Sequence, residues 1–465
     1  MGKFKIIAVA LLAVFAFQTY TVVRNALCDT EFTQTLPDIH WGPLGSQNEI
    51  EDASIKPFNI NIDEKILEEL KRKLSDELNS SRLTPPLEGI GFEYGFNSNY
   101  LKDVANYWLN KYDWRSREKL LNQFPSFKTT ISGLNIHFQH IKSKSSGKYK
   151  KTRPVLVLHG WPGSIVEHQK LIPLLTDPKD SDVNFEVVVP SLPGYGFSDG
   201  AAKRGLGPVQ VGQIFVKLMK RLGHEKFYIQ GGDWGAIIGT YMAALFPANV
   251  VGFHSNTCMS SHPRATLRML GATFFPSLFF NPQEAERFNP LTNSWTFLIR
   301  ETGYMHIQAT KPDTVGVALS HSPTALAAHI LEKFSTWTNE NGMFKPDGGL
   351  THKFSLDELL DNIMVYWVTN SIRTSLRLYS EFFGPNHFRL GLETVPVKVP
   401  TSCIVPRNDG YVFQTESMVA ETFQNLISYN YAPDGGHFFA MEHPDILADD
   451  VLPFVKSVEE LHRPF

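Results

Sequence analysis

Residues 231–235 read Gly-Gly-Asp-Trp-Gly, with Asp233 at the centre. The apolar run Phe227–Gln230 precedes this stretch, and the helix-like run Ala236–Leu245 follows it. Small residues on both sides of a central reactive residue, between a strand and a helix, are typical of a sharp turn that lifts one side chain above a parallel sheet. The residues must be small because the helix packs tightly against the strand. The pattern therefore predicts a nucleophile at Asp233.

A carboxylate at this position implies different chemistry from the more usual serine. A serine must first lose a proton to a base, whereas an aspartate with a pKa near ~3.9 is already ionised at neutral pH. Asp233 can therefore attack a saturated carbon directly and form an ester, which leaves a histidine free to activate water in a second step. Taken alone, the same stretch also fits a glycine-rich turn in which Asp233 caps the following helix.

A His-Gly-Trp-Pro motif, residues 159–162, follows the first apolar strand of this region. In folds with this type of turn, the loop after such a strand supplies one backbone N–H to the oxyanion site, and the residue after the nucleophile supplies the other. We therefore expect the N–H groups of Trp161 and Trp234 to stabilise the anion that forms when water attacks the ester.

A Gly-Gly-His-Phe motif, residues 435–438, places His437 after the last predicted strand. The chain order nucleophile, acid, histidine is that of the α/β-hydrolase fold, so His437 is the expected base for water. The orienting acid should follow the strand that ends near Val405, where Asp409 is best placed. The other acidic residues near this position are Asp434, which is close to His437 in sequence, and Glu416 and Glu421, which lie in a predicted helix.

Short apolar runs alternate with helical stretches through the middle of the chain, which predicts a parallel sheet buried on both faces. The predicted strands are 153–159, 185–190 and 227–230, and the helices between them are 164–175 and 209–222. After His254 the alternation stops, and residues 260–395, rich in aromatic residues, His and Pro, indicate a helical insertion over the sheet. Strands return at 397–405 and 426–431, before a final helix from about residue 446.

The first residues form an apolar run, 6–23, that follows Lys3 and Lys5 and is interrupted only by polar residues near its end. As a helix it would span roughly 27 Å, about the hydrocarbon thickness of the thinner intracellular membranes. A retained single-pass anchor is the favoured interpretation, and a cleaved signal peptide is the alternative. The flanking charges do not determine the orientation.

These features together predict an α/β-hydrolase fold with a helical lid and an N-terminal extension that carries a membrane anchor. The expected divisions are the anchor at 1–24, the extension at 25–150, the first part of the core at 151–258, the lid at 259–395 and the second part of the core at 396–465. The lid contains tyrosines whose hydroxyl groups could donate hydrogen bonds to a leaving oxygen. Spacing alone does not choose among Tyr304, Tyr366 and Tyr379.

The composition excludes several classes of protein. The formal net charge of −3 over 465 residues gives no electrostatic reason to expect a nucleic-acid partner. The three cysteines are few and widely spaced, which predicts neither a disulfide framework nor a metal site and favours a reducing compartment. The cysteines therefore give no reason to expect a metal.

At these motifs the chain resembles the microsomal epoxide hydrolases, including the insect juvenile hormone epoxide hydrolases. The resemblance covers nearly the whole length, with the anchor, the Tyr-Trp and Asp-Trp pairs at 107–108 and 113–114, and the motifs above. Its most specific stretches are 301–308, Glu-Thr-Gly-Tyr-Met-His-Ile-Gln, and 310–314, Thr-Lys-Pro-Asp-Thr.

The resemblance implies a two-step hydrolysis of an epoxide to a diol, with Tyr304 and Tyr379 holding the epoxide oxygen. It implies a lipophilic epoxide and water as the reactants, no cofactor, and the endoplasmic reticulum membrane as the location. The family usually carries Glu where this chain has Asp409, and an Asp can also orient an imidazole. The substrate can be a terpenoid hormone or a xenobiotic or lipid epoxide. The alternatives are a haloalkane dehalogenase, which needs no lid tyrosines, and an inactive lipid-binding homologue.

Overall fold

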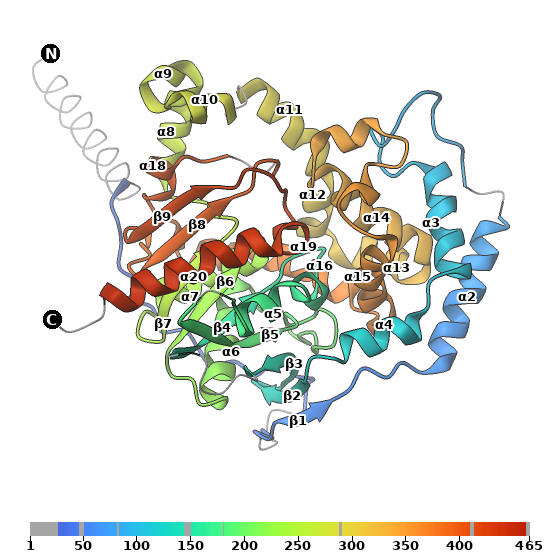
Figure 1. The fold of residues 1–465 in the computed structure, drawn as a ribbon, viewed down its shortest axis with the longest axis horizontal. Helices are drawn as coiled ribbons and strands as arrows, with labels where there is room; N and C mark the ends of the chain where they lie inside the picture. The colour runs from blue at the N-terminus through green and yellow to red at the C-terminus, as the bar shows by residue number, and fades with distance from the viewer. Residues whose placement is uncertain are drawn as a thin grey trace, which may run out of the picture.

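The computed structural model describes residues 27–45, 51–80, 83–143, 149, 151–179, 181–287, 291–409 and 413–461. Its centre is a nine-stranded sheet with the order β1-β2-β3-β5-β4-β6-β7-β8-β9 (Figure 1). The strands are β1 (Lys56–Phe58), β2 (Ser126–Ile131), β3 (Leu134–Ile141), β4 (Lys151–Leu158), β5 (Val183–Pro190), β6 (Phe227–Gly231), β7 (Val250–Ser255), β8 (Thr401–Val405) and β9 (Leu426–Tyr431). β1, β2, β3 and β5 pair antiparallel, whereas β5, β4, β6, β7, β8 and β9 pair in parallel.

The central parallel strands are buried on both faces, as their uninterrupted apolar composition predicts. All five residues of β6 are buried, and so are residues 155–158 of β4. The covering helices are α5 (Leu171–Thr176), α6 (Pro208–Arg221), α7 (Trp234–Leu245) and α20 (Pro444–Leu461). α5 packs on α20 and α6 packs on α7, and α20 crosses in front of the strands in Figure 1. The predicted parallel sheet is confirmed.

The N-terminal extension contains both strands and helices. β2 and β3 pair with each other and continue the central sheet, so strands occur where only an extension was expected. The helical part of the extension near residues 98–121 is divided into α3 (Ser98–Asn110) and α4 (Trp114–Leu121). The division occurs because the side chain of Asp113 accepts a hydrogen bond from the Arg115 backbone and so begins a new helix.

The region between β7 and β8 is a helical insertion, which we call the lid. Its helices are α8 (Pro263–Phe274), α9 (Pro276–Phe279), α10 (Pro282–Arg287), α11 (Leu291–Glu301), α12 (Gly303–Thr310), α13 (Pro312–His321), α14 (Pro323–Thr336), α15 (Leu356–Thr369), α16 (Ile372–Phe382) and α17 (Pro385–Phe388), with short 3-10 turns at Glu340–Phe344, Leu350–His352 and Leu392–Thr394. Several of these helices begin with proline, whose fixed φ suits the first helical turn and whose missing N–H is not needed there.

The N-terminal extension is fastened to lid helix α15 by polar contacts. The guanidinium of Arg117 pairs with Asp361 at 2.5 Å, and the hydroxyl of Tyr112 donates to the same carboxylate at 2.8 Å. One turn earlier, Tyr107 donates to Asp357 at 2.9 Å. Helix α2 (Glu64–Leu78) buries three leucines at helical spacing and packs against α14. The extension therefore braces the lid from the side opposite α10 and α11 in Figure 1.

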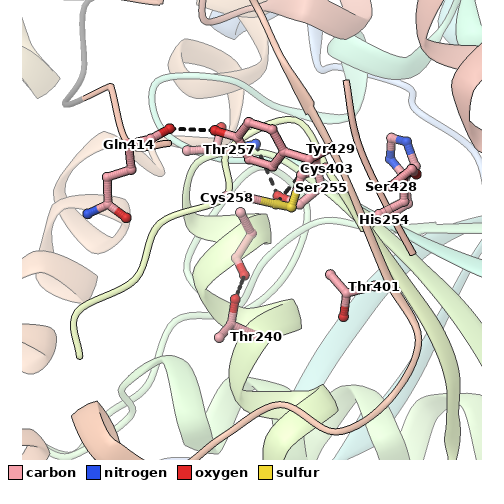
Figure 2. Close-up of a disulfide and its surroundings, with 12 residues drawn as sticks. Thr240, His254, Ser255, Thr257, Cys258, Thr401, Cys403, Gln414, Ser428 and Tyr429 are labelled. Atoms are coloured by element: carbon pink, nitrogen blue, oxygen red, sulfur yellow. Dashed lines mark hydrogen bonds between the residues drawn. A yellow bond between two sulfur atoms is a disulfide. The ribbon is translucent and has the colours of Figure 1, made fainter. Parts of the chain in front are cut away.

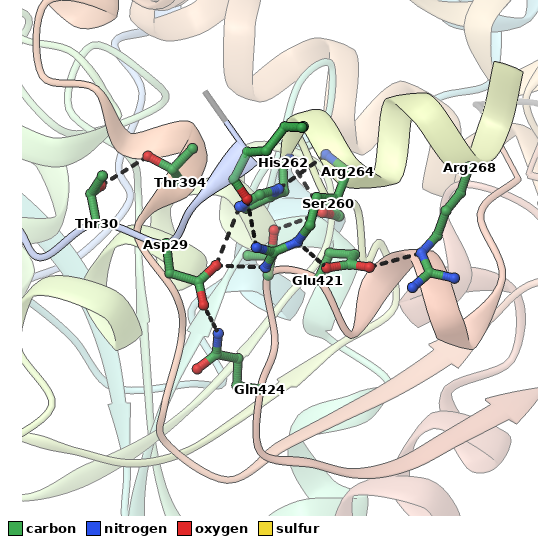
Figure 3. A network of polar contacts seen from close by, with 11 residues as sticks. Asp29, Thr30, Ser260, His262, Arg264, Arg268, Thr394, Glu421 and Gln424 are labelled. Carbon is green, nitrogen blue, oxygen red and sulfur yellow. Dashed lines mark hydrogen bonds and ion pairs between the residues drawn. The ribbon is translucent and has the colours of Figure 1, made fainter. Parts of the chain in front are cut away.

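The arm at residues 27–45 is bound to the first helix of the lid (Figure 3). Arg264, in the first turn of α8, donates to the Leu27 carbonyl at 2.7 Å and pairs with Asp29 at 2.6 Å. Its Nε also pairs with Glu421 at 2.6 Å, and Gln424 donates to the other oxygen of Asp29 at 2.7 Å. Among the described residues, no helix is long and apolar enough to span a membrane. The apolar run 6–23 lies outside the described residues.

The cysteines were expected to form no disulfide framework, but the structure contains one disulfide. Cys258 and Cys403 are bonded to each other across 145 residues of sequence (Figure 2). The two residues meet because β7 and β8 are neighbours in the sheet, although the whole lid separates them along the chain. Only Cys28, among the described residues, is a free and exposed thiol. The cysteines therefore give no argument for a reducing compartment.

Replacing Arg117 with alanine should destabilise the protein. The side chain of Asp361 is only 3% exposed, and a buried charge that loses its partner costs about 3 kcal/mol. We expect Arg117→Ala to unfold several degrees below the wild type in a thermal scan. The control is Arg72→Ala, which removes an exposed pair with Asp76 and should unfold at the wild-type temperature. Equal midpoints for the two variants would contradict the bracing role.

Candidate active site

Asp233 stands at the tip of the turn between β6 and α7, with φ of 49° and ψ of −126°. A positive φ is strained for a residue with a side chain. The neighbouring glycines make the turn possible. A Cβ at Gly231 would lie 2.6 Å from the Gly235 carbonyl oxygen, and one at Gly235 would overlap the backbone of Leu158 in β4. The close packing of strand, turn and helix therefore requires the small residues of the motif.

The backbone N–H of Trp161 donates to Asp233 Oδ1 at 2.7 Å. Trp161 lies in the loop after β4, next to Gly160, where a Cβ would overlap the carboxylate of Asp233. Trp234 directly follows Asp233 and begins α7, so its N–H belongs to the first turn of that helix and has no acceptor within it. The two predicted oxyanion donors thus flank the carboxylate, and one of them already binds it.

His437 lies between two carboxylates in a buried position. Its Nε2 is 3.3 Å from Asp233 Oδ2, and its Nδ1 is 3.4 Å from Asp409 Oδ1. The whole residue is 7% exposed. Burial disfavours a charge on the imidazole, but Asp409 and Asp233 together raise the pKa of His437 well above its usual value. The structure therefore brings the three predicted residues into one line of contacts.

The other acidic residues near His437 in sequence have different partners. Asp434 pairs with Lys353 at 2.6 Å and with His443 at 3.3 Å, and these contacts hold its pKa down at about 2. Glu421 pairs with Arg264 and Arg268 of α8 and not with the histidine. Asp409 is therefore the acid that the structure brings to the imidazole among these alternatives.

Two of the three tyrosines lie against the residues that flank the nucleophile. The ring of Tyr304, in α12, stacks on Trp161 with centroids 5.2 Å apart. The ring of Tyr379, in α16, meets Trp234 edge to face at 4.7 Å and lies 6.0 Å from Tyr304. In contrast, the hydroxyl of Tyr366 donates to the Gly163 carbonyl at 2.6 Å and is buried in the core. The lid therefore brings Tyr304 and Tyr379 together and leaves Tyr366 in a structural role.

Aromatic rings enclose the site. Trp337, which the sequence did not single out, has its ring centroid 4.9 Å from that of His437 and 5.1 Å from that of Tyr304. With the rings of Trp161 and Tyr379, it makes the surroundings of the nucleophile apolar. Such walls suit a lipophilic ligand and strengthen the electrostatic interactions between the charged groups inside.

Two carboxyl groups beside His437 were also missed, because nothing in their local sequence marks them. Glu167 lines the same small cavity as Asp233 and His437, and burial raises its pKa to about 8. Glu442 accepts a hydrogen bond from the Gly436 backbone at 2.9 Å, and burial raises its pKa to about 8 as well. Both are therefore largely neutral acids at pH 7.

A group of potential metal ligands lies on other elements of the sheet. His140 of β3, Glu186 of β5 and His224 after α6 hold their ligand atoms within 4.8 Å of one another. The Glu186 carboxylate accepts from His140 at 2.5 Å and lies 3.3 Å from His224. These residues do not line the cavity at Asp233, and the chemistry inferred there does not involve them.

Comparison with known proteins agrees with this arrangement. The family described as "Epoxide hydrolase N terminus" matches residues 55–168, and the family "alpha/beta hydrolase fold" matches residues 153–444. Juvenile hormone epoxide hydrolase 1 of Ctenocephalides felis is 48% identical over 440 residues, which cover 93% of each chain. Epoxide hydrolase 1 of Sus scrofa is 44% identical over 457 residues, covering 97% of this chain and 99% of the relative.

Solved structures give the same result. The crystal structure of juvenile hormone epoxide hydrolase from the silkworm Bombyx mori matches with a TM-score of 0.88 and 46% identity, covering 92% of this chain and 99% of that one. The epoxide hydrolase of Aspergillus niger matches with a TM-score of 0.70 and 28% identity, covering 88% and 97%. The predicted fold and family are confirmed: the chain belongs to the epoxide hydrolases of the α/β-hydrolase fold.

Proposed function

We propose that this enzyme converts lipophilic epoxides to vicinal diols through an ester on Asp233. One observation carries the proposal. The two oxygens of the Asp233 carboxylate have different surroundings, since Oδ1 accepts the Trp161 N–H at 2.7 Å while Oδ2 lies 3.3 Å from His437. Oδ1 is thus placed where the oxyanion forms in the second step. Oδ2 faces His437, the proposed base.

In the first step, Oδ2 of Asp233 attacks one carbon of the epoxide ring. A new C–O bond forms, the ring C–O bond breaks, and the ring oxygen takes a proton from a tyrosine hydroxyl. Tyr304 and Tyr379 are the proposed donors, because their rings lie against Trp161 and Trp234 on either side of the nucleophile. Hydrogen bonds that strengthen as charge develops on the oxygen lower the barrier.

In the second step, water attacks the carbonyl carbon of the ester and gives a proton to His437. The oxyanion forms on Oδ1, where the N–H groups of Trp161 and Trp234 stabilise it. The intermediate then expels the diol oxygen, which takes the proton from His437. The proton of the regenerated carboxylic acid returns to the tyrosinate through solvent. The net reaction consumes one epoxide and one water.

The charge on Asp233 couples the two steps. The carboxylates of Asp409 and Asp233 both raise the pKa of His437 in the free enzyme. Once Asp233 is esterified its charge disappears, so the pKa of His437 falls. The imidazolium then releases its proton to solvent, and the neutral imidazole can accept a proton from water. When the carboxylate of Asp233 is restored, His437 takes up a proton from solvent again. Formation of the ester on Asp233 therefore makes His437 able to act as the base that hydrolyses this ester.

The proposed substrates are apolar epoxides, either a juvenile hormone or another lipid or xenobiotic epoxide. The aromatic walls around Asp233 and the names of the relatives support this class. A haloalkane dehalogenase would use the same carboxylate without the tyrosine pair, and an inactive carrier would need no triad. Both the tyrosine pair and the triad lie around the carboxylate of Asp233, and this combination favours the epoxide hydrolase.

We also propose that residues 6–23 anchor the enzyme in the membrane of the endoplasmic reticulum. The support is the length and apolar composition of this run and the lysines that precede it. A membrane location agrees with the proposed substrates, because apolar epoxides partition into lipid.

His437→Gln should separate the two chemical steps. Alkylation of Asp233 needs no base, whereas hydrolysis of the ester does. We expect the variant to accumulate a covalent adduct, seen by mass spectrometry as one substrate mass added to the protein, with turnover reduced by about 10³-fold or more. Asp233→Asn should form no adduct with the same epoxide. An unmodified His437→Gln protein after incubation would contradict the ester mechanism.

The tyrosine pair can be tested against a matched tyrosine in the same lid. Tyr304→Phe and Tyr379→Phe should each slow formation of the ester by about 10²-fold, the usual loss when one oxyanion donor is removed. The control, Tyr366→Phe, removes a buried hydrogen bond to Gly163 and should lower stability by about 1 kcal/mol without slowing ester formation. The measurement is the single-turnover alkylation rate. Equal rates in all three variants would reject the assignment.

A further inference from the structure

Helices α8 and α9 are apolar on two opposite sides. On the inner side Ala265, Ala272 and Phe280 form a small core with Met418. On the outer side, large apolar side chains are 44% to 78% exposed. We call these exposed residues the outer patch: Leu267, Leu270, Phe274, Phe275 and Leu278. The small core covers only the inner side, and the exposure of the outer patch shows that it lacks a cover within the described residues.

The outer patch is a continuous strip rather than a scatter of single residues. Leu267, Leu270 and Phe274 follow one another at spacings of three and four, which puts them on one line along α8. The chain continues through Phe275 into α9, whose Phe279 ring lies close to Gly271 of α8. Contiguous apolar surface of this kind marks a site of interaction with another protein or a membrane.

The contacts of Leu27 and Asp29 indicate what covers the outer patch. Arg264, in the first turn of α8, binds both the Leu27 carbonyl and the Asp29 carboxylate (Figure 3). The apolar run 6–23 ends four residues before Leu27. Four extended residues reach at most about 14 Å, and the 12-residue helix α8 is only about 18 Å long. A bilayer that holds the run therefore passes close to the outer patch.

We propose that the outer patch inserts into the same bilayer that holds residues 6–23. The inference rests on the proposed anchor and adds a second, specific contact with lipid. α8 is the first helix of the lid, so this contact would place the lid against the membrane in which apolar epoxides dissolve. Arg264 and Arg268 remain outside the lipid, because both pair with Glu421 on the inner side.

Nitroxide labels on the full-length chain test this placement. In a Cys28→Ser background, single cysteines replace Phe274, Leu278 or, as a control, the exposed Phe344 of the lid's 3-10 turn. The labelled proteins are reconstituted in phosphatidylcholine vesicles, and collision rates with oxygen and with a water-soluble nickel chelate are measured. We expect labels at 274 and 278 to favour oxygen, as in lipid, and the label at 344 to favour the chelate.

Two results would overturn the proposal. Chelate-dominated collisions at 274 and 278 would show an aqueous surface, and low collision rates with both reagents would show cover by protein, either residues 1–26 or a second copy of the chain. Each variant is also assayed for diol formation from a water-soluble epoxide. If the labels at 274 and 278 favour oxygen but no sample forms diol, the proposed function is rejected and the membrane contact is still supported.

A second inference concerns the water that cleaves the ester. A small cavity of about 10 Å³ is lined by Asp233, His437, Glu167 and His168. A cavity of about this volume can hold a single water molecule. His168 is 2% exposed, and neither of its ring nitrogens has a hydrogen-bond partner among the residues described. Buried polar groups are normally hydrogen-bonded to protein or to ordered water, so the cavity has the size and the polar lining of a water site.

The structure assigns Glu167 to holding the hydrolytic water beside His437, within the mechanism proposed above. Its carboxyl group occupies the space where a side chain at position 163 would lie, so Gly163 leaves room for it. The backbone of Gly160 also hydrogen-bonds to this carboxyl. An acceptor fixed in this way can bind one hydrogen of the water while His437 takes the other.

Single-turnover kinetics of Glu167→Gln and Glu167→Ala test this role. Glu167→Ala should hydrolyse the ester at least 10-fold more slowly while forming it at the wild-type rate, so that kcat and KM fall together. Glu167→Gln keeps an acceptor oxygen and should recover most of the hydrolysis rate. Wild-type hydrolysis in Glu167→Ala would reject the assignment. An equal loss of both steps in both variants would show a purely structural residue.

Discussion

The hydrogen bond from the Trp161 backbone to Asp233 is the contact on which the site depends. It exists because β4 and β6 are parallel neighbours, with Leu158 opposite Gly231, so that the two loops after them meet at one edge of the sheet. Any side chain at Gly160 or Gly235 would push the loop or the helix away. The strained φ of Asp233 is held by this packing, which directs one carboxylate oxygen to the backbone donor and the other to His437.

The lid completes the site with groups that the sheet does not provide. Tyr304 and Tyr379 come from α12 and α16, which pack on each other, and Trp337 follows α14. The extension braces the lid through Arg117 and Asp361, and the N-terminal arm holds its first helix through Arg264. The Cys258–Cys403 disulfide also joins the chain just before the lid to strand β8, which follows the lid (Figure 2). Segments far apart in sequence thus fix the distance between tyrosines and nucleophile.

The sequence predicted the parts of the site that local motifs encode. Asp233, Trp161 and His437 follow strands and carry the small neighbours that their turns require, so their positions were readable. Spacing alone did not choose among Tyr304, Tyr366 and Tyr379, because helix packing in the lid decides which hydroxyl is committed to Gly163. The disulfide was missed because 145 residues separate cysteines on adjacent strands. The burial of Glu167 was likewise invisible, since only the folded loop brings it to the cavity.

Isotope labelling of a single turnover tests the central claim most directly. With enzyme in excess over epoxide in water enriched in heavy oxygen, the ester mechanism transfers an oxygen of Asp233 to the diol and a solvent oxygen to the carboxylate. We predict an unlabelled diol and a heavy-oxygen label in the peptide that contains Asp233. A labelled diol in the first turnover, with an unlabelled Asp233 peptide, would mean that water attacks the epoxide directly and would contradict the account.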